Sequence, residues 1–174
     1  SLIVAVSVAL TATVIGLFLG LVAGYLRRVD AVVMRIMDGL MAIPGVLLAI
    51  ALMAVMRASL TTVIVAIMVP EVPRVVRLVR SVVLTLRELP FVEAAVVAGT
   101  RLPRILTAHI RPTTLAPLIV QATYICASAI IIEAALSFLG AGTPPEVPSW
   151  GNIMAEGRGF FLIAPWLILF PGIW

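Results

Sequence analysis

Five long apolar runs, separated by short segments that hold most of the arginines, constrain this chain more than any other feature. A membrane-spanning helix requires roughly 20 mostly apolar residues. Hydrophobic residues make up 63% of the 174 residues and charged residues 11%, whereas soluble domains average about 45–50% and about 25%. Lipid must therefore solvate much of this chain, and we predict an all-α integral membrane protein with five visible transmembrane helices. The runs are 2–26, 31–56, 60–86, 112–138 and a last one that begins near Phe160 and reaches Trp174.

The distribution of the arginines predicts how these helices are oriented. All twelve basic residues are arginines, and ten of them lie in or near the segments 27–35 and 74–111. Short loops rich in arginine stay in the cytoplasm. We therefore predict that 27–35 and 87–111 are cytoplasmic and that 140–159 is an extracytoplasmic loop before the last helix. The net charge of +4 then reflects membrane topology and not nucleic-acid binding.

The first two apolar runs contain local signals for packing and bending. Gly16, Gly20 and Gly24 form a small-xxx-small ladder, which lets two membrane helices approach closely. The second helix is expected to begin near Ala31, and Pro44-Gly45 should kink it. Its polar residues have two predicted roles: Asp30 is a suitable N-cap, and Arg35 and Asp38 are spaced to pair on one face.

Charges inside apolar runs are costly and usually face a cavity or a partner, and Glu71 and Glu133 lie inside such runs. Glu71 and Arg74 lie beside two prolines, roughly 16 Å along the third helix. They form either an i,i+3 ion pair that neutralises itself or a contact for cargo where the prolines open the helix onto the translocation path. Glu133 lies in the last part of the fourth helix, near the outer interface, and is a third candidate for that path.

The segment between the third and fourth runs predicts a short helix that binds a partner. Pro90 suits the first position of a helix and Glu93 its first turn, and Gly99 is well placed as the C-terminal cap. Pro103 permits a second short helix, and Pro112 opens the next long one. The alternative is an elbow that lies on the lipid headgroups. Helical spacing places one apolar stripe on the short helix, formed by Phe91, Ala94, Ala95 and Ala98.

The chain lacks the residues that catalysis would require. It contains no lysine, so it cannot form a GxxxxGK[ST] phosphate-binding loop. His109 and Cys126 are the only residues of their types, and they lie on different segments without metal-ligand spacing. We therefore expect no enzyme activity, cofactor or metal in this chain itself.

Four stretches together resemble a known family of transport proteins. Glu93-Ala94-Ala95 with Gly99 and Pro112 is similar to the EAA loop of ABC-importer permeases, and His109 before Pro112 is similar to the peptide subgroup. The other two stretches are 29–44 and 133–158, the latter containing Glu-Ala-Ala-Leu-Ser-Phe-Leu-Gly and Pro-Ser-Trp-Gly. The whole chain thus resembles the second permease subunit of the dipeptide/oligopeptide/nickel group of binding-protein-dependent importers. Departures at Val72, Arg111 and Thr113 weaken any inference about cargo.

The resemblance implies a type I permease core in the bacterial inner membrane, with 1–174 as a transmembrane domain that is incomplete at both ends. It also implies a heterodimer with a homologous permease, two cytoplasmic ATPase subunits that hold ATP and Mg²⁺, and an extracytoplasmic substrate-binding protein. The segment 87–111 is then the cytoplasmic EAA coupling loop. The expected function is inward transport of peptides or related solutes by alternating access. The competing function is an ATP-independent carrier or channel that uses Glu71 and Glu133 as ion or proton sites.

Overall fold

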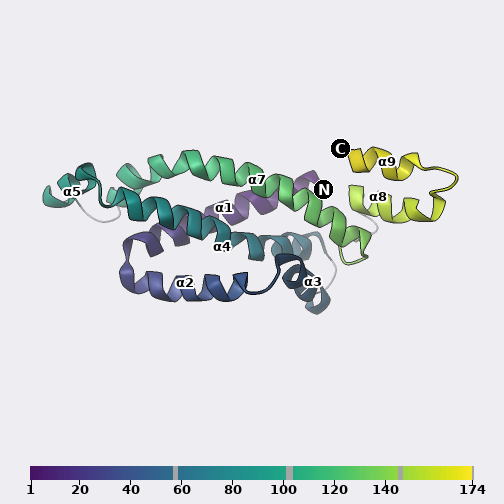
Figure 1. Cartoon of the computed structure of the whole chain (residues 1–174), viewed down its shortest axis with the longest axis horizontal. Coiled ribbons are helices and arrows are strands. Elements are labelled where there is room, and N and C mark those ends of the chain that lie inside the picture. The colour runs from purple at the N-terminus through teal and green to yellow at the C-terminus, as the bar shows by residue number, and fades with distance from the viewer. Residues whose placement is uncertain (57–58, 101–103, 145–146, 174) are drawn as a thin grey trace. The chain divides into compact units, whose positions relative to one another are not determined.

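The protein is almost entirely helical (Figure 1). The computed structural model describes residues 1–56, 59–100, 104–144 and 147–173, with the backbone alone at 93, 96 and 107–109. None of these residues forms a strand, so the prediction of an all-α fold is confirmed for the described part of the chain. The elements are α1 (Leu2–Tyr25), α2 (Arg27–Met41), α3 (Gly45–Val55), α4 (Leu60–Leu86), α5 (Pro90–Val97), η1 (Ile105–Ile110), α7 (Arg111–Phe138), α8 (Trp150–Gly157), η2 (Arg158–Phe160) and α9 (Trp166–Ile173).

Two of these helices, α1 and α7, are long and apolar enough to cross a membrane. The pair α2 and α3 forms a third candidate if the two helices make one broken span. Helix α4 has 27 residues but also four charges in its C-terminal two thirds, which makes it less apolar than α1 and α7. The described helices thus support an integral membrane protein with at least two spans, and the number five stays a prediction.

The second apolar run is divided at Pro44, where its Pro-Gly pair predicted a kink. Helix α2 ends three residues before Pro44 and α3 begins directly after it. Pro44 has no N–H to donate and adopts φ −54° and ψ 128°, outside the helical region. The kink is therefore confirmed and is a complete break between two helices. By contrast, Pro70 and Pro73 lie inside the continuous helix α4, so they do not interrupt it.

The predicted N-cap role of Asp30 is wrong. Helix α2 begins at Arg27, four residues before the expected start, after Leu26 in an extended conformation (φ −99°, ψ 100°). The Asp30 amide already donates to the Leu26 carbonyl at 2.9 Å, so Asp30 lies within the first turn. Its side chain forms an ion pair with Arg80 of α4 instead of capping its own helix.

The described contacts divide the chain into two compact units, the first formed by 1–9, 44–70 and 124–174 and the second by 10–43 and 71–123. In the second unit, the glycine ladder of α1 packs against α4, as predicted. A Cβ atom on Gly16 would lie 2.4 Å from the Cβ of Val75, although carbon atoms in contact normally keep about 3.5–4.0 Å apart. All three facing valines are buried. The pairs are Gly16 with Val75, Gly20 with Val79 and Gly24 with Val83.

In the first unit, the short helix in the 140–159 loop begins three residues earlier than expected. The sequence Pro-Ser-Trp-Gly-Asn at 148–152 predicts a turn and 153–157 a short helix, whereas α8 begins at Trp150. Ser149 explains the difference, because its extended backbone (φ −135°, ψ 156°) and its side chain, which accepts from the Asn152 amide, form an N-cap.

The last helix also begins later than the expected Phe160. Phe160 ends the 3₁₀ turn η2, a turn follows, and α9 begins only at Trp166, directly after Ala164-Pro165. A residue before proline is disfavoured in helical conformation, whereas proline itself suits a helix start. The aromatic and apolar residues after Phe160 therefore did not indicate the boundary, and the proline did. Helix α9 packs back against α8 within the same unit.

Candidate functional sites

The first candidate site is the coupling segment, centred on α5. Pro90 is the first residue of α5, as predicted, and Glu93 lies on its first turn. Gly99 has φ +74°, the left-handed conformation that glycine adopts most easily. The next amide, of Thr100, donates to the Ala95 carbonyl at 3.0 Å, which closes the end of the helix. The predicted start and cap are both confirmed. Pro112 is the second residue of α7, within one position of the predicted opening.

Helix α5 is anchored by one side chain and leaves its apolar face uncovered. Val92 is buried, with 2% of its surface exposed, and α5 packs on η1. The predicted stripe faces outward: Phe91 is 44% exposed, Ala94 and Ala98 are exposed and Ala95 is half-buried. Sequence analysis missed Val97, which is 88% exposed and lies three residues after Ala94 on the same helix. The exposed apolar face is thus broader than the alanine pattern indicated.

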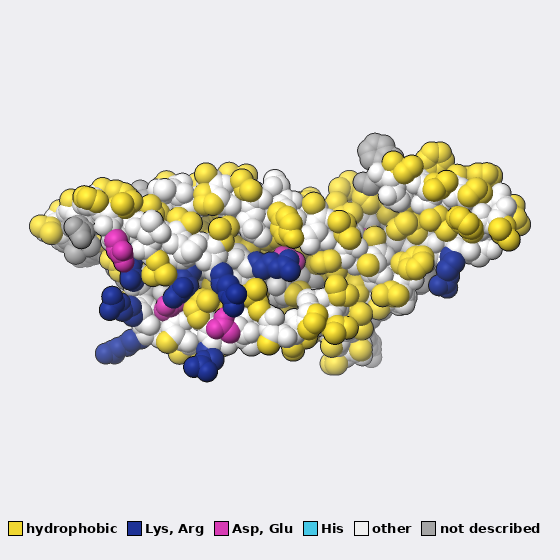
Figure 2. Space-filling view, in the orientation of Figure 1, with side chains coloured by type: hydrophobic (Ala, Val, Ile, Leu, Met, Phe, Trp, Pro, Cys, Tyr) yellow, Lys and Arg dark blue, Asp and Glu magenta, His cyan; other side chains and the backbone are white. Residues whose placement is uncertain are grey.

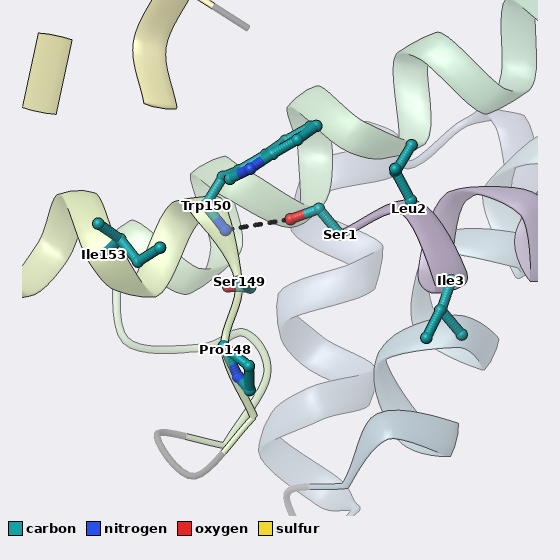
Figure 3. Close-up of a pocket in the computed structure, with 7 residues that line it drawn as sticks. All are labelled: Ser1, Leu2, Ile3, Pro148, Ser149, Trp150 and Ile153. Atoms are coloured by element: carbon teal, nitrogen blue, oxygen red, sulfur yellow. Dashed lines mark hydrogen bonds between the residues drawn. The ribbon is translucent and has the colours of Figure 1, made fainter. Parts of the chain in front are cut away.

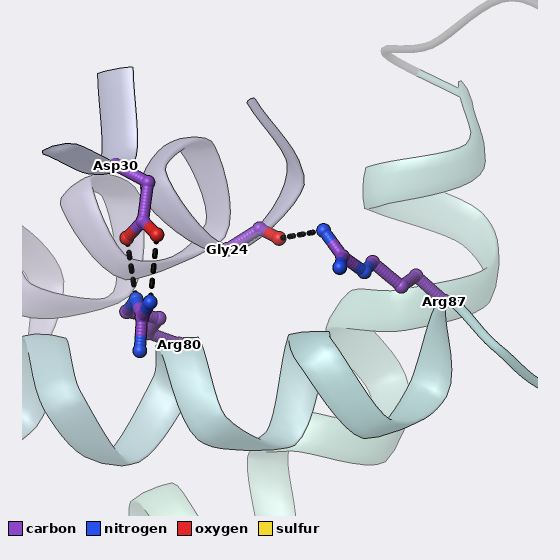
Figure 4. A network of polar contacts seen from close by, with 4 residues as sticks. All are labelled: Gly24, Asp30, Arg80 and Arg87. Carbon is purple, nitrogen blue, oxygen red and sulfur yellow. Dashed lines mark hydrogen bonds and ion pairs between the residues drawn. The ribbon is translucent and has the colours of Figure 1, made fainter. Parts of the chain in front are cut away.

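The coupling segment follows a polar junction in the second unit (Figure 4). The Arg80 guanidinium binds both carboxylate oxygens of Asp30, with Nη2 2.6 Å from Oδ2. Arg87, the first residue of the 87–111 segment, donates to the Gly24 carbonyl at 3.4 Å and lies 3.8 Å from the Glu88 carboxylate. These contacts hold the end of α4 against the turn between α1 and α2.

A second ion pair extends this junction along α2. Arg77 Nη2 lies 2.6 Å from Asp38 Oδ1, so the partner of Asp38 is Arg77 of α4 and not the predicted Arg35. Figure 2 shows arginine and acidic side chains gathered over α2 and the C-terminal half of α4. Two carboxylates of α2 are thereby bound by two arginines of α4, which fixes the register of the two helices.

Glu71 and Arg74, the second candidate site, form a direct ion pair. Arg74 Nη1 donates to Glu71 Oε1 at 2.8 Å, the i,i+3 contact that the spacing allowed. The two side chains differ in burial, because Glu71 is 2% exposed and Arg74 46%. The second carboxylate oxygen of Glu71 is buried and has no hydrogen-bond partner in the described part of the chain. The pair is therefore only partly satisfied.

Glu133, the third candidate, is fully buried near the C-terminal end of α7. Three hydroxyl groups donate to its carboxylate: Ser1 Oγ to Oε2 at 2.6 Å, and Ser137 Oγ and Thr143 Oγ1 to Oε1 at 2.9 and 3.2 Å. Ser1 is 132 positions away in the chain, so no local pattern could have indicated this contact. Glu133 belongs to the first unit and Glu71 to the second.

A shallow hollow of about 340 Å³ lies beside this network (Figure 3). Ser1 forms part of its wall and accepts a hydrogen bond from the Trp150 amide at 3.2 Å. The remaining lining residues are mostly apolar, as are those that line a second hollow, of about 260 Å³, between α3 and the 140–142 turn. No group of three His, Cys, Asp or Glu side chains within metal-binding reach occurs among the described residues, and the His109 side chain lies outside them. The first hollow is lined by Ser1, Leu2, Ile3, Pro148, Ser149, Trp150 and Ile153.

An all-helical chain with apolar spanning helices and an arginine-rich junction at one end of α4 is an integral membrane protein. Comparison of its sequence with known protein families identifies the particular family. The chain belongs to the family described as the inner membrane component of binding-protein-dependent transport systems, whose sequence profile matches residues 12–173. Membership of this family supports a location in the inner membrane and a role in transport rather than in enzyme catalysis.

Similar proteins are named as permeases of peptide transporters. The chain is 54% identical over 151 residues to a probable peptide ABC transporter permease of Sinorhizobium fredii, covering 87% of this chain and 52% of that protein. It is 44% identical to a dipeptide transport system permease of Alkalihalophilus pseudofirmus, covering 92% and 53%. A glutathione transport system permease of Pectobacterium atrosepticum is 38% identical, covering 94% and 55%. The chain thus spans about half the length of the curated relatives it matches.

Proposed function

We propose that this chain is the membrane-spanning permease subunit of an ATP-driven importer that moves peptides into the cell. Its family and the names of its relatives support a peptide transporter. The sequence contains no lysine and hence no phosphate-binding loop, so ATP and Mg²⁺ would be bound by separate ATPase subunits. Alternating access of the permease would then be driven from outside the chain. Dipeptides, longer peptides and glutathione are all cargo candidates, because relatives named for different cargoes have similar identities.

The exposed apolar face of α5 carries this proposal. Phe91 and Val97 are 44% and 88% exposed, although burying a large apolar side chain contributes about 1.5–3 kcal/mol. The arginines around α5 predict that it lies in the cytoplasm, where lipid cannot cover this face. We infer that a groove of the ATPase subunit covers it. The small side chains of Ala94 and Ala98 would let the groove approach the helix closely.

The remaining partners complete the assembly that we propose. Apolar side chains of α1 and α7 are exposed, among them Phe18 at 67% and Val120 at 70%. Lipid and a homologous permease subunit would cover these surfaces in a heterodimer. An extracytoplasmic binding protein would deliver cargo to the 140–159 side. Within the membrane, Glu71 and Arg74 are the proposed contacts for a zwitterionic cargo, since Glu71 Oε2 is an unused acceptor and Arg74 is partly exposed.

Substitutions in α5 test the docking role. Ala95→Arg introduces a long charged side chain at the centre of the apolar face, and Gly99→Val forces a branched residue into φ +74°. We expect both variants to insert normally, to lose co-purification with the ATPase and to reduce transport at least tenfold. Thr113→Arg is the matched control, because Thr113 is exposed at the start of α7 and lies outside the α5 face.

Two results would contradict the proposal. If both α5 variants retain the ATPase and transport like the parent, α5 is only an elbow on the membrane surface. If the full-length protein transports in vesicles without any ATPase subunit, the competing function, an ATP-independent carrier or channel, is correct. In that case substitution of Glu71 or Glu133 should abolish the activity.

A further inference from the structure

The Glu133 carboxylate is the centre of an ordered network in the first unit. It is 0% exposed, and the three hydroxyls of Ser1, Ser137 and Thr143 donate to its two oxygens. An ionised carboxylate only accepts hydrogen bonds, and a buried one is costly unless donors surround it. No arginine side chain forms an ion pair with Glu133 in the described part of the chain. The carboxylate is therefore held by hydroxyl groups alone.

The same hydroxyls bind backbone amides within 141–144 and 147–152, the described residues that we call the outer loop. The Trp150 amide donates to Ser1 Oγ and the Thr143 amide to Ser137 Oγ, both at 3.2 Å. Each of these two hydroxyls accepts from the outer loop and donates to the carboxylate. The relay runs in one direction, from amide to hydroxyl to carboxylate.

A second group of contacts shapes the outer loop around this relay. Ser149 Oγ accepts from the Asn152 amide at 3.1 Å and lies 3.2 Å from Thr143 Oγ1. The Asn152 side-chain amide reaches the carbonyls of Thr143, Pro144 and Val147 at 3.1–3.2 Å. The loop is thus closed on itself by Asn152 and attached to α7 through Thr143.

Two glycines show how closely the outer loop approaches α7. A Cβ atom on Gly142 would lie 2.1 Å from Ser137 Oγ, and one on Gly151 would lie 2.6 Å from the Ala134 carbonyl oxygen. Side chains at these positions would push the loop away from the relay. The backbone of the outer loop therefore lies directly on the last turns of α7, at the level of Glu133.

We propose that Glu133 is a positioning residue whose carboxylate sets the shape of the outer loop and, through that shape, how tightly the extracytoplasmic binding protein docks. The docking part rests on the proposed function. The arginine distribution predicts that 140–159 is extracytoplasmic, and the family depends on a binding protein. Exposed apolar residues flank the relay, with Leu139 at 66% and Ile153 at 39%. Glu133 itself is covered and both its oxygens are bound, so this role replaces its candidate role in the translocation path.

Hydrogen exchange tests the positioning directly. In the Glu133→Gln variant, the side-chain NH₂ group must face a hydroxyl that donates in the parent, so the relay cannot keep its direction. We expect the amides of Thr143 and Trp150 to exchange at least tenfold faster in the assembled importer. Glu156→Gln is the matched control, because Glu156 is exposed on α8 outside the relay, and it should exchange like the parent.

Docking is measured on the same samples. The readout is the ATPase rate as the concentration of binding protein is increased. We expect Glu133→Gln to raise the half-maximal concentration at least fivefold and to leave the maximal rate unchanged. If Glu133→Gln does not assemble, Ser137→Ala and Thr143→Val remove single donors for the same measurements.

The outcomes separate the two proposals. Unchanged exchange in these variants overturns the positioning role, and unchanged exchange with lost transport returns Glu133 to the path. Faster exchange with an unchanged half-maximal concentration overturns the docking part. A parent importer that the binding protein does not stimulate refutes the proposed function, whereas the exchange result still decides the positioning role.

Discussion

Replacing Gly16 by alanine tests the packing of α1 on α4. The added Cβ would lie 2.4 Å from the Val75 Cβ and 2.5 Å from its Cγ1, about 1 Å or more short of normal carbon contact. Overpacking of this kind lowers the free energy of unfolding by roughly 1–3 kcal/mol. The better helix propensity of alanine offsets about 1 kcal/mol of that loss. We expect a net loss of up to about 2 kcal/mol of unfolding free energy, because the valine is buried and its backbone must shift.

A second glycine of the same chain provides the control. Gly39 lies inside α2, and a Cβ atom there would have no neighbour within 4 Å. Gly39→Ala should therefore stabilise the protein by up to about 1 kcal/mol through helix propensity alone. Denaturant unfolding of both variants in the same detergent measures the difference. If Gly16→Ala is as stable as Gly39→Ala, the close approach of the two helices is refuted.

Three further predictions concern topology and charge. Cysteines placed at Thr100 and Pro148 in a Cys126→Ser background should react with impermeant reagents from opposite sides of the membrane, and labelling from one side would contradict the orientation. Arg80→Gln should leave the Asp30 carboxylate without its main partner and weaken co-purification of the ATPase several-fold, whereas the doubly substituted Arg80→Gln/Asp30→Asn should recover most of the loss. Glu71→Gln/Arg74→Gln should remain stable but change transport or cargo preference, and full activity with unchanged preference would exclude the pair from the translocation path.

Local chemistry made part of this structure predictable. The start of α5 at Pro90 and its cap at Gly99 depend on residues within one turn of each boundary, so the sequence alone indicated them. The same is true of the break at Pro44. The glycine ladder predicted a tight helix contact because its spacing is regular, although nothing in the ladder named α4 as the partner.

Contacts between residues far apart in the sequence could not be predicted, for a physical reason. Asp30 is compatible with an N-cap by residue type, and only the position of Arg80, 50 residues later, shows why its side chain is used elsewhere. Glu133 could be placed along its helix by counting residues, but its complete burial depends on Ser1 and the outer loop. The broad apolar face of α5 was underestimated because the exposure of Val97 depends on how α5 sits on η1.

The central claim is that α5 docks an ATPase subunit. A photo-crosslinking amino acid at Val97, which is 88% exposed, tests it most directly in membranes that contain the full importer. Ile131, which is 70% exposed on the apolar helix α7, is the matched control position. If α5 docks the ATPase subunit, we expect an adduct between Val97 and that subunit and none from Ile131. Absence of the Val97 adduct in an importer that hydrolyses ATP and transports peptide would contradict it.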